Sequence, residues 1–160
     1  MDGTGMSRSS FYLHFRDRYE LAIQLIGDVA TLMYTQGDPW LAGEGDPRQA
    51  LQAGLRGTAA VYVEQGWVLR AIEDAASEDA AAEQAYQGMV QGFIDAVASR
   101  IADDVAAGRT AIADPRRTAA ALVWMNDRYL RQALGREPAE HPDQAADTLL
   151  EVWTATLYPR

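Results

Sequence analysis

Apolar residues recur at helical spacing along most of the chain. One series begins at Leu21, Leu25 and Val29, and the longest series continues from Tyr86 to Val105. Intervals of three and four residues place such side chains on one face of a helix, whereas the two-residue alternation of half-buried strands is nearly absent. The pattern predicts an all-α fold of six or seven helices.

Capping residues, prolines and glycines mark the helix boundaries. Asp17 with Glu20 three residues later is typical of a capping box and predicts a helix start at Asp17. A dense group of glycine, aspartate and proline predicts a loop over residues 37–46. Asp46 and Asp114 each precede a proline, which suits the first turn of a helix. The predicted helices span residues 17–35, 47–63, 67–77, 78–107, 115–134 and 143–158.

Composition narrows the class of protein. The chain has 160 residues, of which 48% are hydrophobic and 23% charged, so it can bury the core of one compact domain. No apolar run approaches the roughly 18 to 20 residues that a membrane span needs, and we expect a cytoplasmic protein with no membrane partner. The absence of cysteine excludes disulfides, a thiol nucleophile and zinc sites built on thiolates.

Charge is unevenly distributed. The net charge of −9 argues against non-specific coating of nucleic acid. Residues 1–19 nevertheless carry three arginines against two aspartates, while the other 141 residues carry 11 arginines against 21 acids. This asymmetry is expected if only the first segment faces a polyanion.

Catalytic motifs are absent from the sequence. The two histidines, His14 and His141, lie near no nucleophile motif, and there is no phosphate-binding glycine loop. The densest acid pairs, such as Asp103–Asp104, are adjacent in sequence, so their side chains point about 100° apart on a helix, and we expect them on solvent faces. We therefore predict neither an enzyme nor a metal or cofactor site.

The last two predicted helices are apolar around most of their circumference. Residues 119–125 form an unbroken apolar run, and residues 149–157 nearly do. Such helices must be covered on more than one side. A homodimer through the last two helices is one explanation. Burial of both helices in the core of a monomer is the alternative.

Residues 3–21 resemble the second half of the helix-turn-helix of TetR-family transcriptional regulators. A turn glycine, Gly5, precedes a short segment rich in serine and arginine, which ends in the aromatic run Phe11–Phe15. The resemblance implies that residues 1–19 are the remnant of a DNA-binding domain whose first helices lie upstream of Met1. Small polar side chains on a short helix can reach phosphates or base edges in the major groove. The expected DNA contacts are Ser7, Arg8, Ser9, Ser10, Tyr12 and His14.

The C-terminal region resembles the EthR branch of the same family. Residues 125–128 and 149–158 carry this likeness. It implies that residues 20–160 form a helical ligand-binding and dimerisation domain with a channel for an apolar ligand. By matched position, Asn126 and Trp153 keep the residues of that branch, Tyr86 and Phe93 stand where it has other aromatics, and Val123 replaces a second asparagine.

A pocket for an apolar molecule needs aromatic walls and few polar groups. The candidates are Tyr62, Tyr86, Met89, Phe93, Trp124, Asn126, Tyr129 and Trp153. Simple core packing is the alternative for each aromatic. Asn126 needs hydrogen-bond partners in its apolar run, and either a ligand or a neighbouring helix can supply them. Asp127 and Arg128 are expected to form an ion pair or a dimer contact.

These patterns predict a ligand-responsive regulator, most simply a repressor. If the N-terminal helices of the DNA-binding domain are present, it would bind double-stranded operator DNA as a dimer and be released by a small apolar ligand. A ligand-binding and dimerisation module without DNA binding is the alternative. The two hypotheses differ in salt-sensitive affinity for DNA.

Overall fold

Six helices make up the part of the chain that the computed structural model describes, which is residues 8–135 and 139–159; for residues 8–17 it describes the backbone only. They are α1 (Arg8–Leu41), α2 (Pro47–Glu64), α3 (Gly66–Glu78), α4 (Ala80–Ala106), α5 (Pro115–Leu134) and α6 (Pro142–Leu157). No strand occurs in these residues, and the all-α prediction is confirmed.

Capping residues begin most helices where the sequence predicted. The Asp46 carboxylate accepts the Gln49 N–H at 2.9 Å, and the Asp114 carboxylate accepts the Arg117 N–H at 3.0 Å. Each cap satisfies one N–H group that has no partner inside the helix. The start of α6 differs by one residue, because His141 is its N-cap and Pro142 occupies its first turn.

The first helix is the main departure from the sequence prediction. It runs without a break through Asp17, so the predicted helix start there is wrong. No glycine or proline lies near Asp17, and a capping box does not by itself interrupt a helix. The helix also continues past Gly37 and Pro39 to Leu41, so the loop is shorter than predicted. Trp40 is 4% exposed, and its burial stabilises a last turn that Pro39 deprives of one hydrogen bond.

A glycine ends α1. Gly43 has a φ of +77°, a conformation that side-chain-bearing residues rarely adopt. A Cβ there would also lie 2.5 Å from an Arg100 guanidinium nitrogen. Both constraints require glycine at this position.

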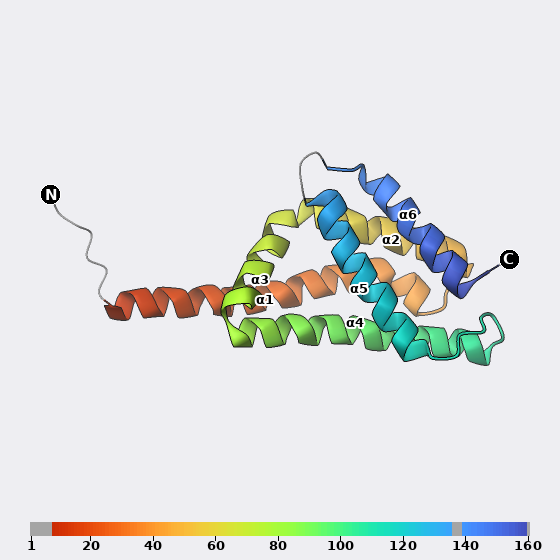
Figure 1. Cartoon of the computed structure of the whole chain (residues 1–160), viewed down its shortest axis with the longest axis horizontal. Helices are drawn as coiled ribbons and strands as arrows, with labels where there is room; N and C mark the ends of the chain where they lie inside the picture. Colours follow the sequence, from red (N-terminus) through yellow and green to blue (C-terminus); the bar gives the residue numbers. More distant parts are fainter. Residues whose placement is uncertain (1–7, 136–138, 160) are drawn as a thin grey trace.

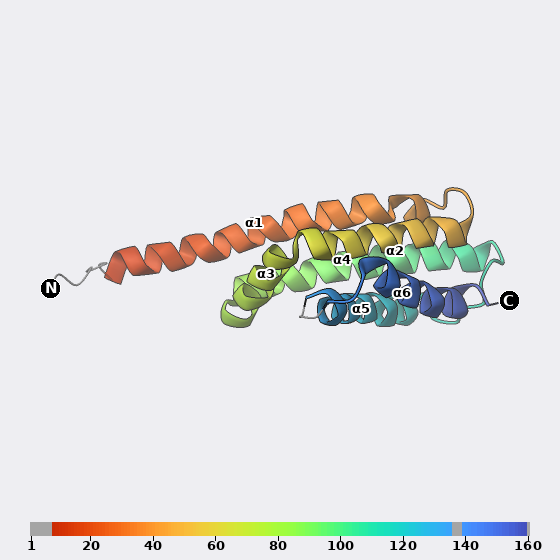
Figure 2. The ribbon, with the colours of Figure 1, turned by 90° about the horizontal axis from the view of Figure 1, so that it is seen from above.

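The helices form an elongated bundle with α1 extending from one end. The first turns of α1 project beyond the other helices, and the rest of α1 packs against α2 and α4 (Figure 1). Helices α5 and α6 lie side by side on one side of the bundle (Figure 2). Near the projecting end, the Tyr19 hydroxyl donates to Glu78 at 3.2 Å and Arg18 pairs with the same carboxylate. These contacts fix α1 to the end of α3.

Candidate ligand-binding site

An apolar cavity of about 120 Å³ lies inside the bundle. Five helices contribute to its wall: Met33, Gly37, Trp40 and Leu41 from α1; Leu51, Gly54, Leu55, Thr58 and Tyr62 from α2; Met89, Val90, Phe93 and Val97 from α4; Val123, Asn126 and Asp127 from α5; and Trp153 from α6. Most of these side chains are aliphatic or aromatic. Such a wall favours an apolar occupant held by few polar contacts.

Close packing of α1 on α2 brings α1 into the wall. Gly54 of α2 lies under α1, where an added Cβ would stand only 3.3 Å from the Gln36 carbonyl oxygen. A larger residue at 54 would push the two helices apart. The ring of Phe93 stacks on Tyr34 of α1, with 4.3 Å between centroids, which fixes α4 against the same segment.

Asn126 supplies the main polar handle of the cavity. The Trp153 indole N–H donates to the Asn126 carbonyl oxygen at 2.8 Å and joins α6 to α5. Because an indole nitrogen can only donate, this bond fixes the orientation of the amide. The Asn126 NH₂ group has no hydrogen-bond partner among the described residues. A helix-to-helix bond and a free donor thus coexist at one residue.

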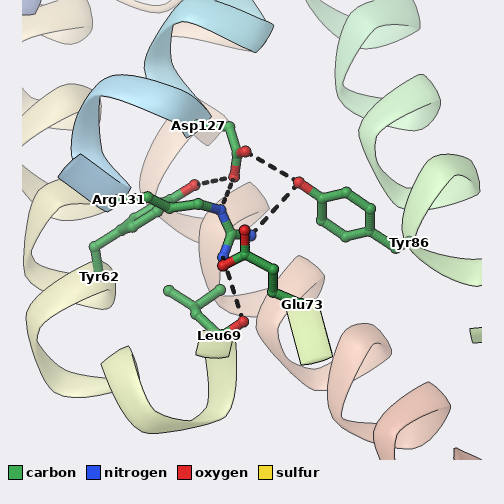
Figure 3. Close-up of polar contacts among 6 residues, drawn as sticks. All are labelled: Tyr62, Leu69, Glu73, Tyr86, Asp127 and Arg131. Carbon is green, nitrogen blue, oxygen red and sulfur yellow. Dashed lines mark hydrogen bonds and ion pairs between the residues drawn. The ribbon is translucent and has the colours of Figure 1, made fainter. Parts of the chain in front are cut away.

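Asp127, which lines the cavity, holds a polar cluster (Figure 3). The Tyr62 hydroxyl donates to its Oδ1 at 2.7 Å, and the Tyr86 hydroxyl donates to its Oδ2 at 3.0 Å. The Arg131 Nε donates to Oδ1 at 2.9 Å, while another Arg131 nitrogen reaches the Leu69 carbonyl oxygen at 3.3 Å. The expected ion pair with Arg128 does not form within the described residues; Asp127 pairs instead with Arg131, one helical turn away on the same face. The alternative, a dimer contact of Asp127 and Arg128, stays a prediction.

The tyrosines of this cluster are held neutral. Burial raises the pKa of Tyr62 well above 10, and the neighbouring Asp127 carboxylate raises it further. Burial and Asp127 likewise raise the pKa of Tyr86 to about 12. Despite burial, the negative charge of Asp127 raises the pKa of Arg131. Asp127 and Arg131 form an ion pair, and the protonated hydroxyl groups of Tyr62 and Tyr86 donate to its carboxylate.

A second carboxylate, Asp104 of α4, does not line the cavity but is connected to its wall residue Trp40 through Tyr158. It is 1% exposed, which corrects the prediction that the Asp103–Asp104 pair lies on a solvent face. Arg100 and Arg109 pair with its Oδ1 at 2.9 and 2.5 Å. The Tyr158 hydroxyl donates to its Oδ2 at 2.6 Å and accepts the Trp40 indole N–H at 3.1 Å. Trp40 in turn meets Trp153 edge to face, with 5.5 Å between centroids.

The structure brings together five of the eight residues expected in a pocket. Tyr62, Met89, Phe93, Asn126 and Trp153 line the cavity. The other three do not. Tyr86 belongs to the Asp127 cluster, Trp124 is 39% exposed, and the Tyr129 hydroxyl donates to Glu140 at 3.2 Å.

Sequence reasoning placed no residue of α1 in the site, and it also missed most of the α2 wall. Met33, Gly37, Trp40 and Leu41 follow one another at intervals of four, three and one, which is a helical spacing. The signal was present, but the turn-forming residues Gly37, Asp38 and Pro39 outweighed it.

The side chains of the expected DNA contacts lie outside the part of the chain that the structure describes. Ser7 lies outside the described residues. Arg8, Ser9, Ser10, Tyr12 and His14 belong to the first turns of α1, and their side chains lie outside the described part of the chain.

Comparison with known proteins identifies the family. Residues 51–159, about two thirds of the chain, match the family of the C-terminal domain of the transcriptional regulator EthR. The chain belongs to the EthR-like branch of the TetR family of transcriptional regulators. The HTH-type transcriptional regulator EthR of Mycolicibacterium smegmatis (strain ATCC 700084 / mc(2)155) is 24% identical over 159 residues, which are 98% of this chain and 73% of that protein.

Membership of this branch confirms the resemblance found in the sequence. The relative is a transcriptional regulator. Among the residues that the structure describes, no helix has the length and apolarity to span a membrane. The same residues contain no group of acids and histidines arranged to hold a metal ion.

Proposed function

We propose that this EthR-like regulator is a ligand-responsive repressor that binds operator DNA as a homodimer through residues 1–19 and releases it when a small apolar molecule enters the cavity of residues 20–160. One observation carries the proposal. Met33, Gly37, Trp40 and Leu41 line the cavity from the same continuous helix that reaches back to Arg8. A molecule in the cavity would therefore contact the same helix that carries residues 8–19 of the proposed DNA-reading segment, which is residues 1–19.

The cavity supports a definite class of ligand. Its volume of about 120 Å³ is comparable with that of engineered cavities of roughly 150 Å³ that bind benzene. The free NH₂ group of Asn126 calls for a hydrogen-bond acceptor. We expect a ligand the size of a substituted benzene or a short aliphatic chain that carries one carbonyl or ether oxygen.

The exposed faces of α5 and α6 support dimerisation. Trp124 on α5 is 39% exposed and Val152 on α6 is 41% exposed, and the two helices lie side by side (Figure 2). An apolar surface spread over adjacent helices is typical of a protein interface. A two-fold dimer would hold the DNA-binding segments of the two subunits, residues 1–19 of each, about one DNA turn apart, roughly 34 Å.

DNA binding is tested with the full-length protein and a duplex selected from a random library. Fluorescence anisotropy is measured over a series of salt concentrations, because a repressor must lose affinity steeply as salt rises. Arg8→Gln should weaken binding by about tenfold, since one phosphate or base contact is lost. Arg117→Gln removes the same charge from a side chain that is 90% exposed on α5, and it should leave affinity unchanged. If no salt-sensitive binding occurs, the chain is a ligand-binding module.

Ligand binding is tested by calorimetry with two matched probes, toluene and acetophenone. Acetophenone should bind more tightly, because its carbonyl oxygen can accept from Asn126. Asn126→Leu should remove that preference, whereas Gln132→Leu, which replaces an amide outside the apolar cavity, should keep it. The ratio of the two affinities is informative because general destabilisation weakens both probes. An unchanged ratio in Asn126→Leu would remove Asn126 from the ligand site.

A further inference from the structure

A second cavity, of about 190 Å³, lies where α2, α3 and α5 meet. Its wall differs from that of the apolar cavity, although Tyr62 contributes to both. Three guanidinium groups line it, from Arg70, Arg128 and Arg131, against the single carboxylate of Glu73. This is a local excess of positive charge in a chain with a net charge of −9.

Two of these arginines have no counter-charge within the part of the chain that the structure describes. Among the described residues, Arg70 and Arg128 make no ion pair or hydrogen bond, and neither does the Gln132 side chain beside them. Glu73 lies 3.6 Å from an Arg131 nitrogen, and Asp127 pairs with another nitrogen of the same guanidinium. The carboxylates of this region thus serve Arg131, and the charges of Arg70 and Arg128 remain available.

The start of α3 adds a further source of positive potential. Gly66, its first residue, forms part of the cavity wall, and Gln65 before it provides no side-chain cap. The first N–H groups of a helix carry a partial positive charge. The Arg70 guanidinium folds back over this end, since a Cβ on Gly66 would lie 3.7 Å from one of its nitrogens. An anion lying between these two positive groups would be attracted by both of them.

We propose that this cavity binds a small oxyanion, a phosphate or a carboxylate group, between Arg70, Arg128 and the N-terminus of α3. Guanidinium groups form paired, charge-assisted hydrogen bonds with both kinds of oxyanion. An uncapped helix start is a common site for the same ligands. The site is independent of the proposed repressor function, because it uses neither the apolar cavity's Asn126 nor the DNA-reading segment.

Inorganic phosphate and acetate are the probes, titrated separately into the full chain by calorimetry at constant ionic strength. We expect saturable binding of at least one. The comparison shows which oxyanion the site prefers, and phosphate should bind more tightly if Arg70, Arg128 and α3 all converge on it.

The test variant is the double substitution Arg70→Gln with Arg128→Gln. Both side chains are exposed, so the fold should persist. Affinity should fall at least about tenfold, because two charge-assisted contacts are lost. The control is Arg56→Gln with Arg117→Gln, which removes the same net charge from exposed positions outside this cavity and should leave affinity unchanged. Absence of saturable binding of both anions, or an equal loss in the two double variants, would overturn the proposal.

Discussion

The two carboxylates beside the apolar cavity, Asp104 and Asp127, have contrasting surroundings. The Asp104 side chain is 1% exposed and meets two arginines, whereas the Asp127 side chain is 16% exposed and meets one. Asp104 connects α4 to Trp40 at the end of α1 through Tyr158, and Asp127 connects α5 to α2 and α4 through two tyrosines. The Asp104 carboxylate is closed to water, although its partner Arg109 is 43% exposed, while Arg131 of the Asp127 cluster borders a second cavity. Burial, more than the number of partners, should determine what each carboxylate contributes to stability.

The largest effect is expected from Asp104→Ala. The substitution leaves the guanidinium of Arg100, 6% exposed, without its carboxylate and removes the acceptor of the Tyr158 hydroxyl. Breaking one partner of a buried pair lowers the free energy of unfolding by about 3–5 kcal/mol. Urea denaturation measures the loss. Asp103→Ala, at the exposed neighbouring position, is the control and should change stability by less than about 0.5 kcal/mol. Similar values for the two variants would mean that the Asp104 carboxylate and Arg100 are not shielded from water.

A smaller loss is expected from Asp127→Ala. Arg131 keeps Glu73 at 3.6 Å and the Leu69 carbonyl oxygen at 3.3 Å, and water can reach it from the second cavity. We expect the free energy of unfolding to fall by about 2–3 kcal/mol, as for a partly compensated buried charge. The same urea series gives the value. Burial does not explain the contrast between the two carboxylates if Asp127→Ala lowers the free energy of unfolding by more than Asp104→Ala does.

These clusters also show what the sequence could predict. Helix positions followed from apolar spacing and from the caps at Asp46 and Asp114, because these signals act within a few residues. The surroundings of Asp104 could not be predicted, because Tyr158 lies 54 residues away in sequence and the burial of α4 at that point depends on how α1 ends. An arginine and an aspartate four residues apart fit a solvent face of a helix as well as a core, so the sequence did not indicate that Arg100 and Asp104 are buried.

The candidate site was predictable to a similar degree. Asn126 and Trp153 were identified as polar and aromatic wall residues, since an amide in an apolar run is conspicuous. Their mutual hydrogen bond and the contribution of α1 required the packing of three helices. Local turn signals at Gly37 and Pro39 outweighed the helical spacing of Trp40, and burial of Trp40 decided the outcome.

The raised pKa values of the tyrosines in the Asp127 cluster predict that the stability of the protein falls at high pH. The pKa of Tyr86 rises from 10 in the unfolded chain to about 12. A raised folded-state pKa gives stability that is complete below pH 10 and is lost as the pH rises from 10 towards 12, because the unfolded chain releases its proton first. Urea midpoints at pH 9, 10 and 11 should therefore fall more steeply for the wild type than for Tyr86→Phe. Parallel curves would mean that Tyr86 is not held by Asp127.

The smallest effect is expected from an ion pair that lacks burial altogether. Arg56 and Asp147 join α2 to α6 at 3.2 Å, but their side chains are 46% and 53% exposed. Water and salt screen such a pair, and holding two long side chains in place costs entropy, so Arg56→Gln should change the free energy of unfolding by less than about 0.5 kcal/mol. A double-mutant cycle with Asp147→Asn isolates the coupling. A coupling energy close to that lost in Asp127→Ala would show that connecting two helices, and not burial, sets the contribution of a carboxylate in this fold. A coupling energy near zero would support burial as the property that makes Asp104 contribute more to stability than Asp127, and both contribute more than a surface carboxylate such as Asp147.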